Sequence, residues 1–284
     1  MENREQKLYS IRKFKEKLFL GFVFLCTFFS IVPLFSLLIY VCLKGVWALN
    51  LDFFIHLPVP VGTPGGGMAN AIVGTFIIVG LGCLFSLPVG VLGGIWLAEW
   101  GKGKLGFFIR YAVDVMSGIP SIVLGIFAYV LFVLPMKHFS AIAGGFALSL
   151  VMIPYITRTT EEMIRMVPRT LRESALALGI PEWKVTLMVV LRTAWSGIFT
   201  GIMLAVARAA GETAPLIFTA FSSSYWNLSL NQPMASMTVQ IYNYAISPFE
   251  EWQNMAWTGS LVLVTIILII TVTVKKFSKR VKYG

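Results

Sequence analysis

Residues 70–98, NAIVGTFIIVGLGCLFSLPVGVLGGIWLA, make up a run of 29 residues without one charged side chain. An α-helix rises about 1.5 Å per residue and the hydrocarbon core of a bilayer is about 30 Å thick, so about 20 apolar residues are enough to cross it. Three glycines at residues 65–67 precede the run, and Glu99 follows it. We therefore expect these residues to form a transmembrane helix.

The composition extends this expectation to the whole chain. Of its 284 residues, 57% are hydrophobic and 13% are charged, and the mean hydropathy is +0.80. In an ordinary soluble domain about one residue in four is charged. The net charge of +10 does not indicate nucleic-acid binding, because the basic residues lie between apolar runs and not on one soluble face. The sequence predicts an integral membrane protein.

Five more apolar runs are long enough to cross a membrane. They cover residues 18–43, 115–134 (with the helix beginning nearer residue 109), 139–157, 193–216 and 255–274. The first follows a basic segment, as in a signal peptide, but it is too long for one and no small-residue cleavage site follows it. We predict an all-α fold of six transmembrane helices.

The basic residues predict the orientation. The segments before the first run, between the second and third, between the fourth and fifth, and after the sixth hold 6, 3, 6 and 5 of the 23 Lys and Arg residues. Cytoplasmic loops are enriched in Lys and Arg, so we expect both termini in the cytoplasm and a multi-pass protein of the plasma (inner) membrane. On the outer side, residues 234–246, MASMTVQIYNYAI, predict a short helix that lies on the surface or packs back on the bundle, and we favour the second.

Residues 165–192, RMVPRTLRESALALGIPEWKVTLMVVLR, predict a cytoplasmic helical hairpin. A helix over the first half is amphipathic and places Arg172 and Glu173 on its polar face. Gly179 is a natural end for that helix, and Pro181 can open the next one. Such a hairpin is suited to transmit a push from a soluble partner, although a loop lying on the lipid headgroups fits the pattern equally well.

Residues 207–216, ARAAGETAPL, place two charges, Arg208 and Glu212, inside the fifth apolar run. Four residues apart on one helix, the two share a face. A charge at the bilayer centre costs roughly 2.5 to 3.5 kcal/mol on insertion scales, so such residues face a protein interior or a water-filled path. The structural alternative is a self-neutralising ion pair, but two apolar residues would avoid its cost altogether. We favour a functional role.

Residues 173–179, ESALALG, resemble the EAA loop of type I ABC-importer permeases, with Ser174 in place of one alanine. Four further runs resemble the PstA family of phosphate permeases: SGIPSIVLG (117–125), PYITRTTEEMIRMVPRTLRESALALG (154–179), ARAAGETAPLIFTA (207–220) and QPMASMTVQIYNYA (232–245). With the spacing between them, these runs cover most of residues 67–275. Together they are a more specific signal than the EAA loop alone.

This resemblance implies a MetI-like permease fold and a subunit of an ATP-driven phosphate importer. It implies a PstC-like sister permease in a heterodimer, two PstB-like ATPase subunits and a PstS-like external phosphate-binding protein. It assigns coupling to the ATPase to Glu173, Ser174, Ala175 and Gly179, and the substrate path to Arg208 and Glu212. The chain then divides into a cytoplasmic basic segment (1–17), a first helix with its external loop (18–66), the permease domain (67–275, with the coupling loop at about 166–184) and a cytoplasmic tail (276–284).

The chain itself lacks the sequence signatures of an enzyme. It has no G-x-x-x-x-G-K-[ST] phosphate loop and no His, Cys or carboxylate cluster at metal-ligand spacing. We therefore expect no catalytic residue, metal or cofactor in this chain, and ATP with magnesium on the partner ATPase.

The charge pair suits an oxyanion. Arginine presents a planar fork that matches phosphate oxygens, and Glu212 can accept a hydrogen bond from the proton that phosphate keeps near neutral pH, which sulfate lacks. Two alternatives stay open: a permease for another oxyanion or small solute, such as molybdate or sulfate, and an ion-gradient carrier. Such carriers commonly show inverted repeats with broken helices, and no repeat is visible in the sequence.

Other residues carry structural expectations. Pro120, Pro154 and Pro215 lie in or near three of the spans and can kink them, either as packing kinks or as gating hinges. Arg110 and Asp114 predict an ion pair at the cytoplasmic interface.

The end of the fourth span carries four charges that predict a solvated face or a contact with the sister subunit: Arg158, Glu161, Glu162 and Arg165. Small residues predict close helix packing at Gly90, Gly93, Gly94, Gly144 and Gly145.

Overall fold

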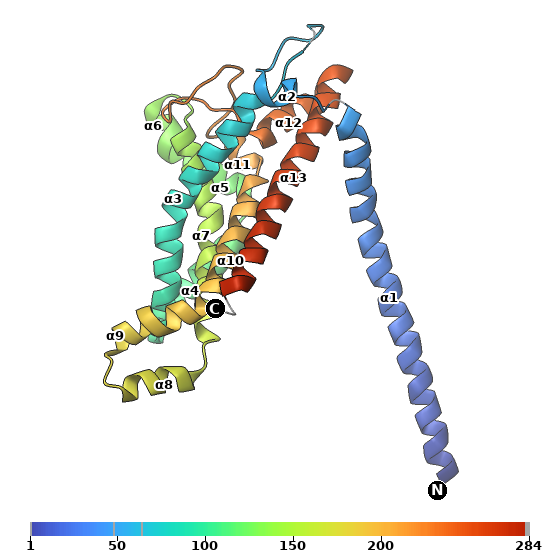
Figure 1. Ribbon diagram of the computed structural model, residues 1–284, viewed down its shortest axis with the longest axis vertical. Helices are drawn as coiled ribbons and strands as arrows, with labels where there is room; N and C mark the ends of the chain where they lie inside the picture. The colour runs from blue at the N-terminus through green and yellow to red at the C-terminus, as the bar shows by residue number, and fades with distance from the viewer. Residues whose placement is uncertain (1, 48, 64, 282–284) are drawn as a thin grey trace.

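The computed structural model describes residues 2–47, 49–63 and 65–281, and in these ranges the regular structure is helical throughout, without a strand. Figure 1 shows long helices that run side by side, with two short helices, α8 and α9, at one end. The predicted all-α fold is confirmed.

Five helical stretches are long and apolar enough to cross a membrane. They are α1 (Glu2–Trp47), α3 (Ala69–Glu99), α7 (Ala141–Arg165), α13 (Glu250–Val281), and α9 (Glu182–Val185) continued by the π-helical turn η2 (Thr186–Val190) and α10 (Leu191–Ala210). Other short helices are α2 (Asp52–Ile55), α8 (Arg169–Ala177), α11 (Ala214–Ile217) and α12 (Met237–Ala245).

The sixth span is a bent pair of helices. The first helix of the pair, α4 (Gly103–Gly118), meets the continuous stretch α5 (Ser121–Ala128), η1 (Tyr129–Val133) and α6 (Leu134–Met136) at an angle of 103°. The span predicted over 115–134, with its helix beginning near residue 109, is therefore two helices, and the kink expected at Pro120 is a full break. The break has a local cause, because Pro120 has no N–H to donate and restricts Ile119 to an extended conformation, with ψ of 130°. Counted as one span, the pair completes the predicted six.

Close packing between α3 and α7 forms the centre of the bundle. A Cβ atom added at Gly94 would lie 2.6 Å from Cβ of Thr160, and one added at Gly145 would lie 2.4 Å from Cβ of Leu81. Gly90 is crowded in the same way by Ile156, at 2.8 Å, whereas the nearest atom to Gly144 is Cβ of Ala220 at 2.9 Å, and Ile78 of α3 follows at 3.3 Å. Small residues let the two backbones approach this closely, as predicted, whereas Gly93 has its nearest neighbour at 3.8 Å and does not belong to the tight contact.

The short helix α12 packs back on the bundle and does not lie on its surface. Met237, Val239 and Tyr244 are buried, and the ring of Tyr244 stacks on Trp252 of α13 with 4.9 Å between centroids. The favoured alternative for this segment is confirmed.

Helix α1 diverges from the other helices (Figure 1). The carboxyl end of α1 packs on α13. There the ring of Tyr40 lies edge-on to Trp257, and the hydroxyl of Thr258 donates to the carbonyl of Gly45 at 3.0 Å. None of its most apolar 18-residue window is buried. Most of α1 is thus left for lipid or for another protein.

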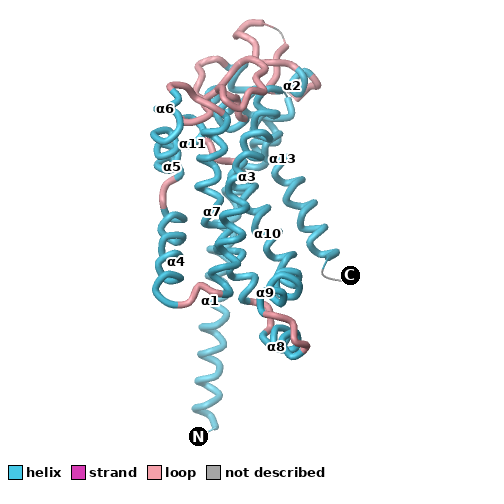
Figure 2. The backbone as a smooth tube through the Cα atoms, turned by 90° about the vertical axis from the view of Figure 1, so that its left-hand side faces the viewer, coloured by secondary structure: helices cyan, strands magenta, loops and turns pink. Residues whose placement is uncertain are grey.

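The amino end of α1 and the carboxyl end of α13 point toward the end of the molecule that carries α8 and α9 (Figures 1 and 2). The predicted basic segment continues as helix from residue 2, and residues 276–281 of the predicted tail continue α13. Residue 1 and residues 282–284 lie outside the described ranges.

Candidate functional site

Arg208 lies in the last turn of α10, and Glu212 lies just beyond the end of that helix. The prediction of one continuous helix through residue 216 is wrong, because Pro215 cannot donate the backbone hydrogen bond that would extend α10 and instead stands in the first turn of α11. The carbonyl of Glu212, left free at this break, accepts a hydrogen bond of 3.0 Å from the hydroxyl of Thr238 in α12.

The break lies deep in the bundle. Ala205 and Ala209 of α10 share one buried cluster with Met152 and Ile156 of α7, and these two residues stand about halfway along α7. Arg208 therefore lies near the middle depth of the helices, where a charge is most costly.

The geometry of the pair is open. Nε of Arg208 is 3.7 Å from Oε1 of Glu212, which is within ion-pair range but longer than a hydrogen bond. The arginine side chain is 54% exposed and the glutamate 16%. The guanidinium carbon lies 4.5 Å from the ring centroid of Tyr155, a cation–π contact. No hydrogen bond from Arg208 occurs among the described residues, so its N–H groups can bind an anion.

Tyr155 was not anticipated as part of this site. It lies within the run PYITR, but nothing in its spacing connects it with Arg208, 53 residues later. The contact arises because α7 and α10 pack against each other.

A second helix break adjoins the first. Gly125 of α5 is packed against Pro215 of α11 so closely that an added Cβ would lie 2.5 Å from Cα of that proline. Pro120 precedes α5 at the bend, whereas Pro154 lies inside α7 without interrupting it. Two of the three prolines thus stand at helix breaks, and a hinge role for any of them stays a prediction.

The predicted helical hairpin is confirmed at the opposite end of α10. Helix α8 is followed by Gly179, whose φ of +76° is the left-handed conformation that glycine adopts without strain. Pro181 precedes α9 as its N-cap, one position before the expected one. Ala175 is buried against Val185, whereas Glu173 and Ser174 are exposed.

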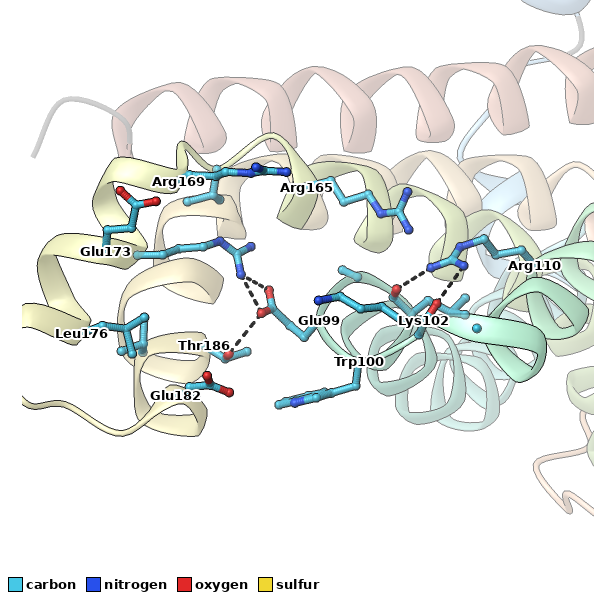
Figure 3. A pocket seen from close by; sticks show the side chains of 17 residues that line it. Glu99, Trp100, Lys102, Arg110, Arg165, Arg169, Glu173, Leu176, Glu182 and Thr186 are labelled. Atoms are coloured by element: carbon cyan, nitrogen blue, oxygen red, sulfur yellow. Dashed lines mark hydrogen bonds and ion pairs between the residues drawn. The ribbon is translucent and has the colours of Figure 1, made fainter.

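An ion pair that sequence reasoning missed attaches this hairpin to α3. Nη1 of Arg172 donates to both carboxylate oxygens of Glu99 at 2.6 Å (Figure 3). Nη2 donates to the carbonyl of Ile164 at 3.1 Å. The hydroxyl of Thr186 also donates to Glu99, at 3.4 Å. Arg172 was recognised only as part of a polar face and Glu99 only as the end of a span, and their pairing depends on tertiary structure.

A second cluster of charges surrounds Glu161, whose side chain is 2% exposed. Its carboxylate lies 2.6 Å from Nε of Arg110, 2.7 Å from Nη2 of Arg165 and 3.8 Å from Nη1 of Arg158. Two predictions are therefore wrong: Glu161 is not on a solvated face, and Arg110 pairs with it and not with Asp114. A buried carboxylate requires cations to compensate its lost hydration, and Arg110 supplies one from α4.

Arg110 also binds the carboxyl end of α3. It donates to the carbonyls of Leu97 at 2.6 Å and Gly101 at 2.9 Å. A cation is favourable at a helix carboxyl end, where carbonyls lack partners and the dipole is negative. The end of α3 is thus held on two sides, by Arg110 and by Arg172.

A cavity of about 1120 Å³ opens between the hairpin and the ends of α3 and α4 (Figure 3). Five basic and three acidic side chains line it: Lys102, Arg110, Arg165, Arg169, Arg172, Glu99, Glu173 and Glu182. Arg208 and Glu212 are not part of it. In the described ranges, no group of three or more His, Cys, Asp or Glu side chains is placed to hold a metal ion.

Comparisons with known proteins agree on the type of protein. The family described as "Binding-protein-dependent transport system inner membrane component" matches residues 90–283. The chain is 40% identical over 283 residues to the phosphate transport system permease protein PstA of Haemophilus influenzae, which covers 99% of this chain and 100% of that protein. It is 44% identical over 230 residues to the PstA of Xylella fastidiosa, covering 80% of each chain.

A more distant relative and a solved structure extend the comparison. The probable PstA of Methanocaldococcus jannaschii is 36% identical over 269 residues, which cover 94% of each chain. The inward-facing MetNI methionine ABC transporter has a chain of similar fold, with a TM-score of 0.58 at 19% identity over 75% of this chain and 93% of that one.

Proposed function

The chain belongs to the family of binding-protein-dependent transport system inner membrane components and, within it, to the PstA phosphate permeases, and from this premise we propose that it forms one half of the path through which an ATP-driven importer carries inorganic phosphate. As a permease subunit of an ABC transporter it is a non-enzymatic component.

The position of Arg208 is the observation that carries the proposal. The guanidinium lies at middle depth, beside the break that ends α10, half-exposed and without a hydrogen bond to the described residues. Its fork of N–H groups matches two oxygens of a phosphate ion. Glu212, 3.7 Å away, can accept a hydrogen bond from the hydroxyl group that phosphate retains near neutral pH, and this favours phosphate over sulfate.

The loose ion pair lets phosphate compete for the guanidinium during passage. In the resting state Glu212 neutralises Arg208, and the ring of Tyr155 supports the guanidinium from one side. An arginine that keeps its partner carboxylate nearby binds an anion weakly, which allows the ion to leave. High affinity is therefore assigned to a PstS-like external phosphate-binding protein.

A PstC-like sister permease completes the path in this proposal. The exposed half of Arg208 and the unburied apolar length of α1 both support a protein neighbour in the membrane. The site as it stands in one chain is half of a path.

The α8–α9 hairpin is assigned to one of two PstB-like ATPase subunits, which bind ATP and magnesium. Its exposed Glu173 and Ser174 and its rigid turn at Gly179 suit a docking surface. This places the hairpin and both termini in the cytoplasm, as the distribution of Lys and Arg predicts. ATP binding draws the ATPases together and moves the hairpins, which opens the path outward, and hydrolysis reverses the motion.

Phosphate uptake into vesicles tests the proposal. The complete complex is reconstituted with ATP inside and binding protein outside, with the wild-type chain, Arg208→Gln or the control Arg192→Gln, which removes an exposed arginine from the other end of α10. We expect ATP-dependent uptake in the wild type and the control and none in Arg208→Gln.

Further uptake measurements distinguish the alternative substrates and energy sources. Uptake of molybdate or sulfate in place of phosphate would keep the architecture and reject the substrate. Uptake that needs an ion gradient and no ATP would reject the importer. Normal uptake by Arg208→Gln, with the complex assembled, would reject the role of the buried charge.

A further inference from the structure

We propose that the ion pair between Glu99 and Arg172 is the joint through which movement of the α8–α9 hairpin reaches the transmembrane helix α3. Both side chains are then positioning residues for transport, with no contact to phosphate or ATP. The inference rests on the proposed function, but it concerns the contact of the hairpin with the transmembrane helices and not its contact with the ATPase.

The pair has the geometry of a stiff link. Both carboxylate oxygens of Glu99 lie 2.6 Å from Nη1 of Arg172, and the side chains are only 11% and 25% exposed. Charge-assisted hydrogen bonds of this length are among the strongest in proteins, and partial burial weakens their screening by water. The second nitrogen, Nη2, is fixed on the carbonyl of Ile164 in the last turn of α7.

Apolar contacts between the hairpin and the bundle cannot replace this link. Ala175 and Val185 of the hairpin share a buried cluster with Ile95 of α3 and Ile164 of α7. Such contacts hold surfaces together but are non-directional, so one surface can slide along the other. The arginine and carboxylate fix one atom against another and therefore transmit displacement along α8 to the end of α3.

The displacement then has a route to the charge pair in the membrane. Helix α3 cannot slip against α7, because Gly94 and Gly145 allow no gap between the two helices. Helix α7 carries Tyr155, and the guanidinium of Arg208 rests on the ring of Tyr155. A pull on Glu99 thus moves α3 and α7 as one body and shifts the support of Arg208.

The test measures motion of α3 directly and does not depend on which solute is carried. Nitroxide labels are placed at Gly80→Cys in α3, where an added Cβ meets no atom within 4 Å, and at Leu268→Cys in α13, which is exposed. The three native cysteines are replaced. The distance between the labels is measured by pulsed electron paramagnetic resonance in the assembled complex, with and without ATP.

Three forms are compared: the parent, Glu99→Gln, and the control Glu162→Gln, which removes an exposed carboxylate of α7 outside the hairpin and its cavity. We expect ATP to change the label distance in the parent and the control, and Glu99→Gln to lose more than half of the change. In the unlabelled complexes, phosphate imported per ATP hydrolysed falls about tenfold in Glu99→Gln, while ATP hydrolysis continues. A merely structural role would lower the yield of complex and leave this ratio unchanged.

Arg172→Lys serves as a conservative variant that should still fold, because lysine keeps the charge and one hydrogen bond but lacks the forked guanidinium. We expect this variant to assemble and to recover part of the ratio. An ATP-driven distance change equal to that of the parent in Glu99→Gln, or none in the parent, overturns the inference. If the label results hold but the parent carries no phosphate, the proposed substrate fails and the joint stands.

Discussion

Replacing Gly94 by alanine is expected to destabilise the permease, whereas the same change at its neighbour Gly93 is not. An alanine Cβ at Gly94 would lie 2.6 Å from Cβ of Thr160 and 2.7 Å from the carbonyl oxygen of Thr157. Neither atom can rotate away, since one is backbone and the other is bonded to it. At Gly93 the nearest atom is a methyl group at 3.8 Å, an ordinary contact.

The magnitude follows from comparing the two variants. Both gain the helix propensity of alanine over glycine, about 1 kcal/mol in a soluble helix, so that gain cancels in the difference. Overpacking of a close interface costs about 1 to 3 kcal/mol. With about 2 to 4 °C per kcal/mol for a domain of 150–250 residues, Gly94→Ala should melt roughly 2 to 12 °C below Gly93→Ala.

Thermal unfolding of the purified complex in one detergent measures this difference, with the loss of monodisperse material on size-exclusion chromatography as the readout. Equal midpoints for the two alanine variants would refute the conclusion that α3 and α7 meet without a gap at Gly94.

Three further predictions concern the charged and hairpin residues. Glu161→Ala should cost about 3 to 5 kcal/mol of stability, because it leaves clustered arginines without their buried partner. Glu162→Ala, which breaks an exposed pair, should cost less than about 1 kcal/mol. The yield and melting temperature of the complex measure both effects. Tyr155→Leu should lower phosphate uptake several-fold by removing a cation–π contact worth about 0.5 to 2 kcal/mol, and Tyr155→Phe should retain uptake. Gly179→Ala should weaken co-purification of the ATPase, because it forces a side chain into the left-handed conformation at a cost of about 1 to 2 kcal/mol. Gly103 has a similar φ of +78° but lies outside the hairpin, so Gly103→Ala should leave co-purification unchanged.

The fold was largely predictable because lipid imposes a simple pattern on sequence. The charge-free run over 70–98 corresponds to α3 (Ala69–Glu99). The run over 139–157 corresponds to the first part of α7 (Ala141–Arg165). Hydropathy does not record helix breaks. An apolar run stays apolar where Pro120 or Pro215 interrupts it. The prolines predicted possible kinks, but which of them break a helix required the structure.

The candidate site was predictable where its residues are close in sequence. Arg208 and Glu212 are four residues apart and were found as a pair, and Gly179 was found as the end of α8. The pairs Glu99–Arg172 and Arg110–Glu161 join residues 73 and 51 positions apart, on different helices. No local periodicity encodes such pairs, and Arg110 was assigned to Asp114 because that partner lay within one helical turn.

The attachment of α1 to α13 has a consequence for the synthesis of the protein. The hydrogen bond from Thr258 to Gly45 joins residues 213 positions apart, and Trp257 beside it meets Tyr40. A ribosome makes α1 long before these partners. While the intervening helices are being inserted, α1 therefore has to remain in the lipid without its own anchor, which its uninterrupted apolar surface allows. Its docking has to wait until α13 has been made, and a chain truncated before Trp257 would leave α1 inserted but unattached.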